Sequence, residues 1–377
     1  MRVVFDARHL QTVSRTRGIG RYSRNLLAAF ARGAPEDVEW TLLTLGNFPP
    51  ADRSPLPVHR TRATVRLRRP ELTMLALDPL LLPFELAGQG DLYHSVQLGL
   101  PAVHRGPVVL TIHDLAPLRW PSHYLRLPYA RVGHAWQYAL AKRADAIVAV
   151  SEATKADVVA RLRIPAERVR VIPEAVDAAF HPPSRDAGAA IARERFGVPS
   201  RYVLYVGQFD PRKNMEGLFA AFARAAERDR DLRLVVVGTL GKLAPLMRSA
   251  LERSRADPAR VVITGEVDDE TLAALYAGAE ALLHAAWLEG FGLTALESLA
   301  AGTTVVGYRT GAVAEVVGDA GLLVDAGDPD ALGDALVTLL GDASLGSRLR
   351  ALAKPRAAHF SWDRAADDTL AIYRSLR

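Results

Sequence analysis

The sequence of 377 residues contains no cysteine. This absence excludes disulfide bonds, thiolate zinc sites, iron–sulfur clusters and cysteine nucleophiles, so any catalysis must use other groups. Long apolar runs are also missing. The most apolar stretch, residues 72–87, is interrupted by Asp78, Pro79, Pro83 and Glu85, so it cannot supply the roughly 20 apolar residues that a membrane-spanning helix needs.

What the sequence does contain is the composition of an ordinary globular protein. Hydrophobic residues make up 49% and charged residues 24% of the chain, which excludes collagen-like and disordered proteins. Its length fits two domains rather than one. At the amino terminus only residues 3–5 are apolar before Asp6, too few for a signal peptide, so we expect a cytoplasmic location.

The net charge of +5 is unevenly distributed. Residues 1–180 contain 24 Lys/Arg and 16 Asp/Glu, a net +8, whereas residues 181–377 contain 23 and 26, a net −3. Directly before the apolar segment 72–86 stand Arg60, Arg62, Arg66, Arg68 and Arg69. This arrangement fits either a solvated strand edge and loop or a peripheral contact with the anionic inner face of a membrane. No aromatic residues interleave with these arginines, so nucleic-acid binding is not expected.

Short apolar runs alternate with longer helical patterns, which predicts α/β domains with doubly wound parallel sheets. The expected strands are residues 3–5, 41–44, 108–112, 146–150, 169–172, 202–206, 232–237, 261–264, 281–284, 304–306 and 321–324. We therefore expect two Rossmann-like domains, residues 1–183 and 184–360, joined by a linker within residues 181–188 that contains two prolines and a glycine. Residues 361–377 are expected to form an amphipathic helix capped by Ser361.

The densest chemical signal lies in residues 284–297, where a predicted strand leads into a predicted helix. Gly290 and Gly292 form a tight turn whose backbone N–H groups, at a helix start, can hold an anion such as phosphate. Glu289 lies at the strand end and Glu297 about one turn into the helix. The two carboxylates can therefore hold different hydroxyl-rich parts of one extended ligand. The alternative is a helix start that Glu289 merely caps.

A second signal lies in residues 206–214, another predicted strand-to-helix turn that contains Arg212 and Lys213. Lysine is rare in this chain, with five occurrences. Because a lysine ammonium is a compact point charge, Lys213 suits the neutralisation of a departing diphosphate. The alternative is a solvated basic pair beside a capped turn.

The order of these two motifs, with residues 171–180 between the domains and Ser361-Trp-Asp near the end, resembles the retaining glycosyltransferases of family 4 over nearly the whole chain. The resemblance implies the GT-B fold, in which two Rossmann-like domains face each other across a cleft and the C-terminal helix crosses back to the first domain. The strings Phe5-Asp-Ala-Arg8, Gly18-Ile-Gly-Arg-Tyr22 and Thr111-Ile-His-Asp-Leu115 are most similar to mannosyltransferase-type members that build bacterial polysaccharides and glycolipids.

By these motifs, the resemblance implies that Glu289 and the following backbone hold the donor sugar. It also implies that Glu297 holds the nucleotide ribose and that Lys213 holds the diphosphate. The donor-site residues that it implies in addition are Gly18, Gly20, Gly207, Gln208, Arg212, Val267, Gly290, Phe291, Gly292 and Leu293. Many family members have an arginine at the position of Gln208. Here either Arg212 supplies that charge, or Lys213 and backbone amides hold the diphosphate.

In the first domain, the resemblance implies that Gly18 to Gly20 form a loop that closes over the diphosphate and the acceptor. His113 follows the predicted strand 108–112 and is expected to contact a sugar. Asp114 is expected either to orient the imidazole of His113 or to receive the acceptor. The histidines without a comparable context are expected to be structural: His9, His94, His104 and His284.

The implied reaction is retaining transfer of a hexose from a nucleoside diphosphate sugar to a hydroxyl of a glycan or lipid-linked acceptor. GDP-mannose is the leading donor, and UDP- or dTDP-linked hexoses are the alternatives. No Asp-x-Asp string stands at a predicted strand end, and Asp268 is expected to cap a helix, so neither a metal nor a cofactor is expected. The competing functions are a same-fold nucleotide-sugar epimerase or phosphorylase and a non-catalytic basic module that binds membrane surfaces.

Overall fold

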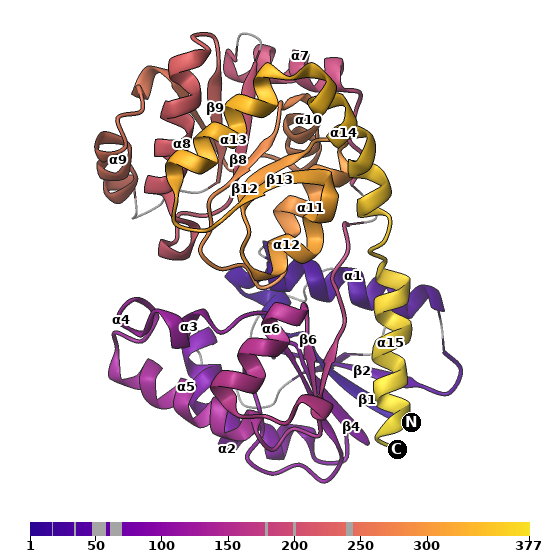
Figure 1. Ribbon diagram of the computed structural model, residues 1–377. Coiled ribbons are helices and arrows are strands. Elements are labelled where there is room, and N and C mark those ends of the chain that lie inside the picture. Colours follow the sequence, from indigo (N-terminus) through magenta and orange to yellow (C-terminus); the bar gives the residue numbers. More distant parts are fainter. Residues whose placement is uncertain are drawn as a thin grey trace. The chain divides into compact units, whose positions relative to one another are not determined.

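The structure is a computed structural model that describes residues 1–16, 18–33, 35–46, 58–60, 70–177, 180–198, 201–238 and 244–377. The described residues divide into two compact units. Unit 1 comprises Met1–Glu174 and Ser361–Arg377, and unit 2 comprises Ala175–Phe360. Each unit is a parallel sheet flanked by helices, so the predicted fold class is confirmed (Figure 1).

Unit 1 contains a seven-stranded sheet in the order β3-β2-β1-β4-β5-β6-β7. Its strands are β1 (Arg2–Asp6), β2 (Glu39–Thr44), β3 (Val58–Arg60), β4 (Leu92–Ser95), β5 (Val108–Ile112), β6 (Ala146–Ala149) and β7 (Val169–Val171). Its α-helices are α1 (Gly18–Gly33), α2 (Pro70–Leu86), α3 (Ala116–Arg119), α4 (Pro121–Tyr124), α5 (Pro128–Ala141), α6 (Glu152–Asp157) and α15 (Trp362–Ser375). Shorter helical turns are η1 (Arg8–Gln11), η2 (Val13–Thr16), η3 (Val158–Leu162) and η4 (Ala166–Arg168).

Unit 2 contains a six-stranded sheet in the order β10-β9-β8-β11-β12-β13. Its strands are β8 (Tyr202–Val206), β9 (Arg233–Val237), β10 (Val261–Gly265), β11 (Leu282–His284), β12 (Val305–Tyr308) and β13 (Gly321–Val324). Its α-helices are α7 (Arg185–Phe196), α8 (Met215–Arg228), α9 (Ala244–Arg253), α10 (Asp269–Gly278), α11 (Leu293–Ala300), α12 (Gly311–Val317), α13 (Pro329–Gly341) and α14 (Ala343–Ala357). The 3-10 turns are η5 (Pro211–Lys213), η7 (Pro258–Arg260) and η8 (Gly318–Ala320).

The strand order reverses at one place in each sheet. In unit 1 the reversal lies between β1 and β4, and in unit 2 it lies between β8 and β11. At such a switch point the connections leave in opposite directions, which opens a crevice beyond the carboxyl ends of the strands. We therefore expect ligand-binding side chains at both switch points.

The predicted domain boundary at residue 183 lies later than the division between the units. Glu174 belongs to unit 1, where its carboxylate is bonded to His113. Phe180 instead packs against Tyr276 of unit 2, with ring centroids 6.0 Å apart. The expected linker 181–188 is wrong in its second half, because Ser184 caps α7 through the backbone N–H of Ala187.

Gly188, which we interpret in the sequence as a linker residue, lies inside α7. A Cβ at this position would lie 2.4 Å from the carbonyl oxygen of Ala274 in α10. Gly278 of α10 has the reciprocal constraint, because its Cβ would lie 2.5 Å from the backbone nitrogen of Ala189. The two glycines therefore allow α7 and α10 to pack at close range.

A buried ionic cluster joins the end of β1 to α2. The guanidinium of Arg8 donates to Asp6 at 2.7 Å and to Asp78 at 2.8 Å, and the hydroxyl of Tyr93 donates to Asp6 at 2.8 Å. All of these side chains are buried. Asp78 therefore interrupts the apolar stretch of α2 because it faces Arg8.

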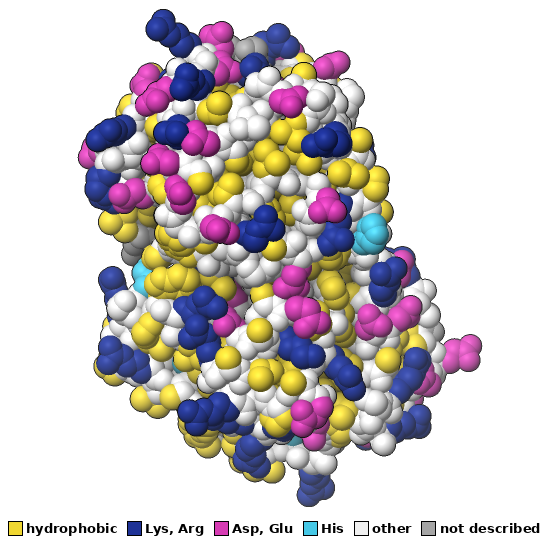
Figure 2. Space-filling model, viewed as in Figure 1, with side chains coloured by type: hydrophobic (Ala, Val, Ile, Leu, Met, Phe, Trp, Pro, Cys, Tyr) yellow, Lys and Arg dark blue, Asp and Glu magenta, His cyan; other side chains and the backbone are white. Residues whose placement is uncertain are grey.

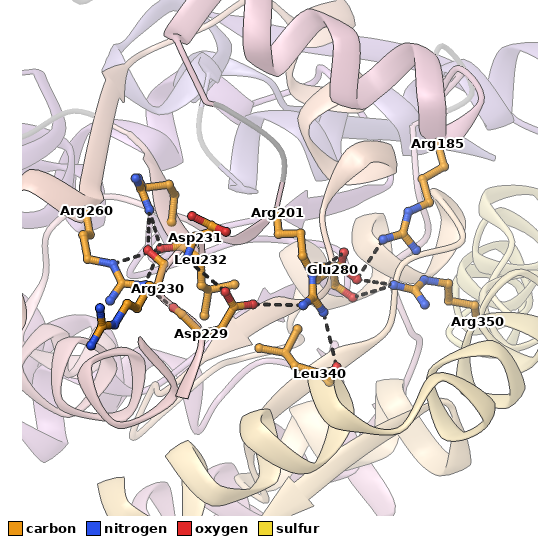
Figure 3. A network of polar contacts seen from close by, with 11 residues as sticks. Arg185, Arg201, Asp229, Arg230, Asp231, Leu232, Arg260, Glu280, Leu340 and Arg350 are labelled. Carbon is orange, nitrogen blue, oxygen red and sulfur yellow. Dashed lines mark hydrogen bonds and ion pairs between the residues drawn. The ribbon is translucent and has the colours of Figure 1, made fainter. Parts of the chain in front are cut away.

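A second polar network lies among α7, α14 and the starts of two central strands of unit 2 (Figure 3). Glu280 accepts from Arg185 at 2.7 Å, from Arg350 at 2.8 Å and from Arg201 at 3.4 Å. Burial raises the pKa of Glu280, but these guanidinium groups outweigh that effect and hold the pKa below its ordinary value. The network lies at the amino-terminal edge of the sheet, opposite the carboxyl ends of the strands.

The C-terminal helix α15 packs in unit 1, as the resemblance predicts. Ser361 caps it by accepting from the backbone N–H of Arg364. Trp362 packs edge-to-face on Tyr22 at 5.6 Å, and Tyr373 is fully buried. The hydroxyl of Tyr373 is hydrogen-bonded to Nδ1 of His94 in β4, so the last helix is joined directly to the sheet.

Two histidines lie in the core of unit 1. Nε2 of His9 is 2.7 Å from the hydroxyl of Ser23, and Nε2 of His94 is 2.8 Å from the hydroxyl of Thr111. Burial lowers the pKa of His9 to about 4 and the pKa of His94 to about 3. Both imidazoles are therefore neutral in the folded protein at neutral pH.

We expect the stability of unit 1 to fall as the pH falls below about 6.5. An unfolded histidine has a pKa of about 6.5, so below that pH it takes up a proton that His9 and His94 do not bind in the folded protein. Proton binding therefore stabilises the unfolded state relative to the folded state. The loss amounts to about 3 kcal/mol for His9 at pH 4. Urea unfolding between pH 7.5 and 4 measures it. His94→Gln should lower stability at pH 7.5 but flatten the pH dependence, and a pH-independent free energy of unfolding in the wild type would contradict this account.

Candidate functional site

The candidate donor site of unit 2 lies at the carboxyl ends of β8 and β11, the switch point of its sheet. Lys213 lies in η5, which follows β8, and Glu289 follows β11. The ammonium of Lys213 donates to Oε1 of Glu289, and Nε2 of His284 lies 3.1 Å from the same oxygen. The side chains of Lys213 and Glu289 are 12% and 10% exposed. Two residues that the sequence places in separate motifs thus form one ion pair.

Local caps hold Lys213 in position. Asp210 caps η5 by accepting from the backbone N–H of Arg212 at 3.0 Å. Asn214 ends this turn in the left-handed region, at φ 52°, and its side chain caps α8 by accepting from the N–H of Gly217. The backbone N–H of Trp287 donates to the carbonyl of Arg212 at 2.7 Å, which ties the turn after β8 to the segment after β11.

The electrostatics of the site keep Glu289 ionised. Burial raises the pKa of this carboxyl, but the ammonium of Lys213, the hydrogen bond to His284 and the charge of Arg212 outweigh burial and hold the pKa well below its ordinary value. Glu289 is therefore an acceptor-only group at neutral pH, suited to sugar hydroxyls. Lys213 is the cation closest to that acceptor in the described part of unit 2.

The glycine turn after Glu289 leads into α11. Gly292 is the N-cap of α11 at φ 95°, a left-handed conformation that strains any residue with a Cβ. Within the described ranges, no side chain caps this helix start, so the backbone N–H groups of the first turn, which begins at Leu293, keep their affinity for an anion. The ring of Phe291 packs on Phe360 at 5.6 Å, so this residue offers backbone rather than side chain to a ligand.

Glu297 lies about one turn into α11, as predicted, and is buried, with 3% of its surface exposed. The hydroxyl of Tyr276 donates to its carboxylate at 2.9 Å. This bond fixes the direction of the carboxylate. The two acidic residues of the motif therefore differ, because Glu289 is paired with a cation and Glu297 is anchored by a neutral hydroxyl.

The remaining donor-site candidates follow the other strands of the same edge. Gly207 follows β8. A Cβ on Gly238, which follows β9, would lie 2.0 Å from the carbonyl oxygen of Gly207, so this close approach requires a glycine at position 238. We did not predict this requirement from the sequence. Gln208 is exposed, and Val267 is half-buried after β10. The guanidinium of Arg212 lies 3.5 Å from Asp210.

Asp268, directly after Val267, is an N-cap, as the sequence predicts. Its side chain accepts from the backbone N–H of Thr271 at 2.7 Å at the start of α10.

In unit 1, His113 follows β5, as predicted. Its Nδ1 lies 3.1 Å from Oε1 of Glu174, and its ring packs edge-to-face against Tyr22 at 4.8 Å. Asp114 is expected either to orient this imidazole or to receive the acceptor, and the hydrogen-bond contact that the structure shows for the imidazole is with Glu174. The carboxylate of Asp114 accepts from the backbone N–H of Ala116 at 2.9 Å.

A pocket of about 300 Å³ lies beside His113 within unit 1. Polar side chains at its wall include Gln97, His113, Asp114 and Tyr138, and apolar ones include Ile19 and Leu98. The pocket opens at the carboxyl ends of β4 and β5, next to the switch point of the sheet. Its mixed lining suits a sugar ring, which has both hydroxyls and apolar faces.

Gly18 and Gly20 do not form the expected loop, because both lie in the first turn of α1. The buried apolar face of that helix, which includes Tyr22 and Leu26, outweighs the low helix propensity of glycine. Gly20 has a packing reason, since a Cβ there would lie 2.3 Å from the carbonyl oxygen of Arg15.

Two residues of the site were not predicted. His284 is expected from the sequence to be structural, yet it contacts Glu289, and its place as the last residue of a strand was the available signal. Glu174 lies in the segment that we use for the family resemblance, but nothing in the sequence links it to His113, which lies 61 residues earlier.

Comparison with known proteins matches both units to sugar-transferring enzymes. Residues 16–180 match the family model "Glycosyltransferase Family 4", and residues 200–342 match "Glycosyl transferases group 1". The chain is 29% identical over 376 residues to O-antigen chain mannosyltransferase B of Escherichia coli, covering 95% of this chain and 96% of that protein. It is 33% identical over 313 residues to D-inositol 3-phosphate glycosyltransferase of Salinispora arenicola, covering 76% of this chain and 69% of that protein.

Solved structures show the same architecture. Sucrose-phosphate synthase from Thermosynechococcus elongatus matches with a TM-score of 0.81 at 22% identity, covering 100% of this chain and 99% of that chain. The complex of Anabaena HepE with UDP-glucose matches with a TM-score of 0.74 at 19% identity, covering 100% of both chains. These similarities confirm the GT-B fold.

Proposed function

The chain belongs to glycosyltransferase family 4, and from this membership we propose that it is a retaining hexosyltransferase that uses a nucleoside diphosphate sugar, with GDP-mannose as the leading donor. One observation carries the proposal. An ionised carboxylate, Glu289, lies beside the ammonium of Lys213 and an uncapped helix start at the switch point of unit 2. This arrangement offers acceptors for sugar hydroxyls next to donors for a diphosphate.

The proposed reaction breaks the bond between the anomeric carbon and the diphosphate oxygen and forms a bond from that carbon to the acceptor oxygen on the same face. The proton of the acceptor hydroxyl moves to the departing phosphate. Negative charge builds on the diphosphate in the transition state, so Lys213, Arg212 and the backbone N–H groups at the start of α11 act where stabilisation is most effective. We propose that these groups suffice without a metal ion or cofactor.

The acceptor is proposed to be a hydroxyl of a glycan or a lipid-linked sugar. The pocket beside His113 offers polar groups to a sugar ring together with apolar walls. A mannosyl donor fits the name of the Escherichia coli relative, which is an O-antigen chain mannosyltransferase. UDP- or dTDP-linked hexoses remain the alternative donors, and an epimerase or a phosphorylase of the same fold is the alternative enzyme.

A nucleotide panel tests the donor. A ligand at 100 times its Kd adds about 2.7 kcal/mol to the stability of the folded state. We expect GDP and GDP-mannose to raise the melting temperature with and without EDTA, and UDP, ADP and dTDP to leave it unchanged. Lys213→Met should abolish the shift, because it removes the diphosphate cation. A shift that requires manganese, or no shift with any nucleotide, would overturn the proposed donor site.

The two acidic residues are expected to affect different kinetic constants. Glu289→Gln removes the charged acceptor at the donor sugar and should lower kcat about 100-fold, a typical cost of losing one transition-state contact. Glu297→Gln should mainly raise KM for the donor, because the ribose does not change during the reaction. Glu227→Gln, on the exposed face of α8, is the control. An unchanged kcat in Glu289→Gln together with lost nucleotide binding would reverse this division.

We also propose that unit 1 contacts an anionic membrane surface. Four of the arginines that suggest this in the sequence, Arg62, Arg66, Arg68 and Arg69, lie outside the described residues. In α2, however, Leu80 is 54% and Phe84 is 82% exposed. The neighbouring helix α5 exposes Tyr129, Val132 and Trp136.

The charge around α5 is of one sign. Residues 115–144 contain five Lys/Arg and no Asp/Glu. Figure 2 shows hydrophobic and basic side chains together along the lower left edge of unit 1, where α5 lies in Figure 1. Exposed apolar and aromatic side chains among basic ones suit the interface of an anionic bilayer. None of the described helices has the length and apolar character needed to cross a membrane.

Sedimentation with vesicles tests this contact. The amount of wild-type protein that sediments should be about ten times larger with vesicles that contain about 30% phosphatidylglycerol than with pure phosphatidylcholine vesicles. The reason is that each basic residue contributes about 1 kcal/mol near an anionic surface. Phe84→Ser with Trp136→Ser should abolish the difference. Leu246→Ser, at an exposed leucine of α9 in unit 2, is the matched control. Equal sedimentation of the wild type and the double variant would show that the α2–α5 surface does not bind the vesicles.

A further inference from the structure

The pair formed by His113 and Glu174 joins two parts of unit 1 that are distant in sequence. His113 follows β5, and Glu174 follows β7 as the last residue of unit 1 before the chain enters unit 2. Nδ1 of His113 lies 3.1 Å from Oε1 of Glu174, and only 4% of Glu174 is exposed. A buried carboxylate needs hydrogen-bond donors, and this imidazole supplies one.

The partner of Nδ1 determines the tautomer of His113. An ionised carboxylate can only accept hydrogen bonds, so Nδ1 must carry the proton that it donates to Glu174. In the neutral imidazole Nε2 then has no proton and presents a lone pair. The other ring nitrogen is thereby prepared to accept a hydrogen bond.

Nε2 of His113 is buried and has no hydrogen-bond partner among the residues that the structure describes. A buried polar atom without a partner costs about 1 to 3 kcal/mol, so such an atom calls for an explanation in terms of a ligand or a catalytic role. His113 lines the 300 Å³ pocket of unit 1. A sugar hydroxyl in that pocket would satisfy the lone pair.

The ring is also fixed in orientation. Tyr22 packs edge-to-face on it with an interplanar angle of 88°, and the hydroxyl of Tyr22 lies 3.4 Å from that of Thr111. The backbone carbonyl of His113 accepts from the hydroxyl of Thr154 at 3.2 Å. With the backbone and the ring edge held in this way, the bond to Glu174 decides which nitrogen faces the ligand.

We infer that Glu174 is a positioning residue for the transfer reaction, because it holds His113 in the Nδ1–H tautomer and so directs the Nε2 lone pair at a hydroxyl of the sugar bound in unit 1. This inference rests on the proposed function. It assigns to Glu174 a role that needs no contact with substrate. It also assigns to His113 the role of acceptor rather than donor.

Three variants test the inference in the full-length protein. Glu174→Ala removes the acceptor and should lower kcat about 10- to 100-fold, a range typical of a misdirected group. Glu174→Gln should restore most of the activity, since its amide oxygen can accept from Nδ1–H. Glu167→Ala, at an exposed glutamate of η4, is the matched control and should behave as wild type. Circular dichroism melting checks that each variant folds.

Two measurements separate positioning from a structural role. In a double-mutant cycle, Glu174→Ala should add nothing in the His113→Ala background, because a positioning residue acts only through its partner. The ¹⁵N chemical shifts of the His113 ring should report the Nδ1–H tautomer in wild type and in Glu174→Gln, and the Nε2–H tautomer or a mixture in Glu174→Ala.

The outcomes distinguish this inference from the proposed function. If the wild type transfers a hexose but Glu174→Ala is fully active, or if the two substitutions have additive effects, Glu174 is not a positioning residue. If no donor supports transfer by the wild type, the proposed function fails. In that case the tautomer measurement still decides whether Glu174 fixes the ring of His113.

Discussion

The ion pair between Lys213 and Glu289 is the interaction on which the site in unit 2 depends. A carboxylate that is only 10% exposed is unfavourable unless a cation and hydrogen-bond donors replace the water that it has lost. The order of strands provides that replacement, because β8 and β11 lie side by side although they are distant in sequence. The turns after both strands then meet, and the carbonyl of Arg212 receives the backbone N–H of Trp287. Charge, turn geometry and sheet order therefore support one another.

The two units repeat one sheet order but place different chemistry at its edge. In unit 2 a cation holds a carboxylate in the charged form. In unit 1 a carboxylate, Glu174, lies within hydrogen-bond distance of an imidazole, His113, at the wall of the pocket. Under the proposed function, this division matches what a glycosyl donor and an acceptor require. The donor side must stabilise a diphosphate, and the acceptor side must recognise uncharged hydroxyls.

The sequence predicts most of the sheet because the buried strands of a parallel sheet are continuous apolar runs. β4 was not predicted because its buried His94 and Ser95 interrupt that apolar pattern. The hydrogen-bond partners of these two side chains lie on β5, on α15 and in the turn after β4, so only the folded structure explains why polar residues are buried there. The same limit applies to glycines. Gly18, Gly20 and Gly188 suggest a loop or a linker in the sequence, but the structure places them in helices, where Gly20 and Gly188 allow a close approach of another segment.

For the candidate site, motifs within one turn were predictable and contacts between distant strands were not. Glu289, Gly292 and Glu297 belong to one strand, turn and helix, so their spacing alone indicates a site. The bond from His113 to Glu174 depends on β5, β6 and β7 being neighbours, which no local pattern contains.

Helix α15 has a consequence for the order in which the chain can assemble. Unit 2 is one continuous segment, whereas unit 1 is completed only by Ser361–Arg377, which follow unit 2 in the chain. During synthesis, the side chains that α15 covers, including Tyr22 and His94, must wait for Trp362 and Tyr373 to leave the ribosome. Unit 2 can reach its final structure before unit 1, although unit 1 is made first. A chain that stopped before α15 would therefore leave unit 1, the unit made first, without the helix that covers Tyr22 and His94.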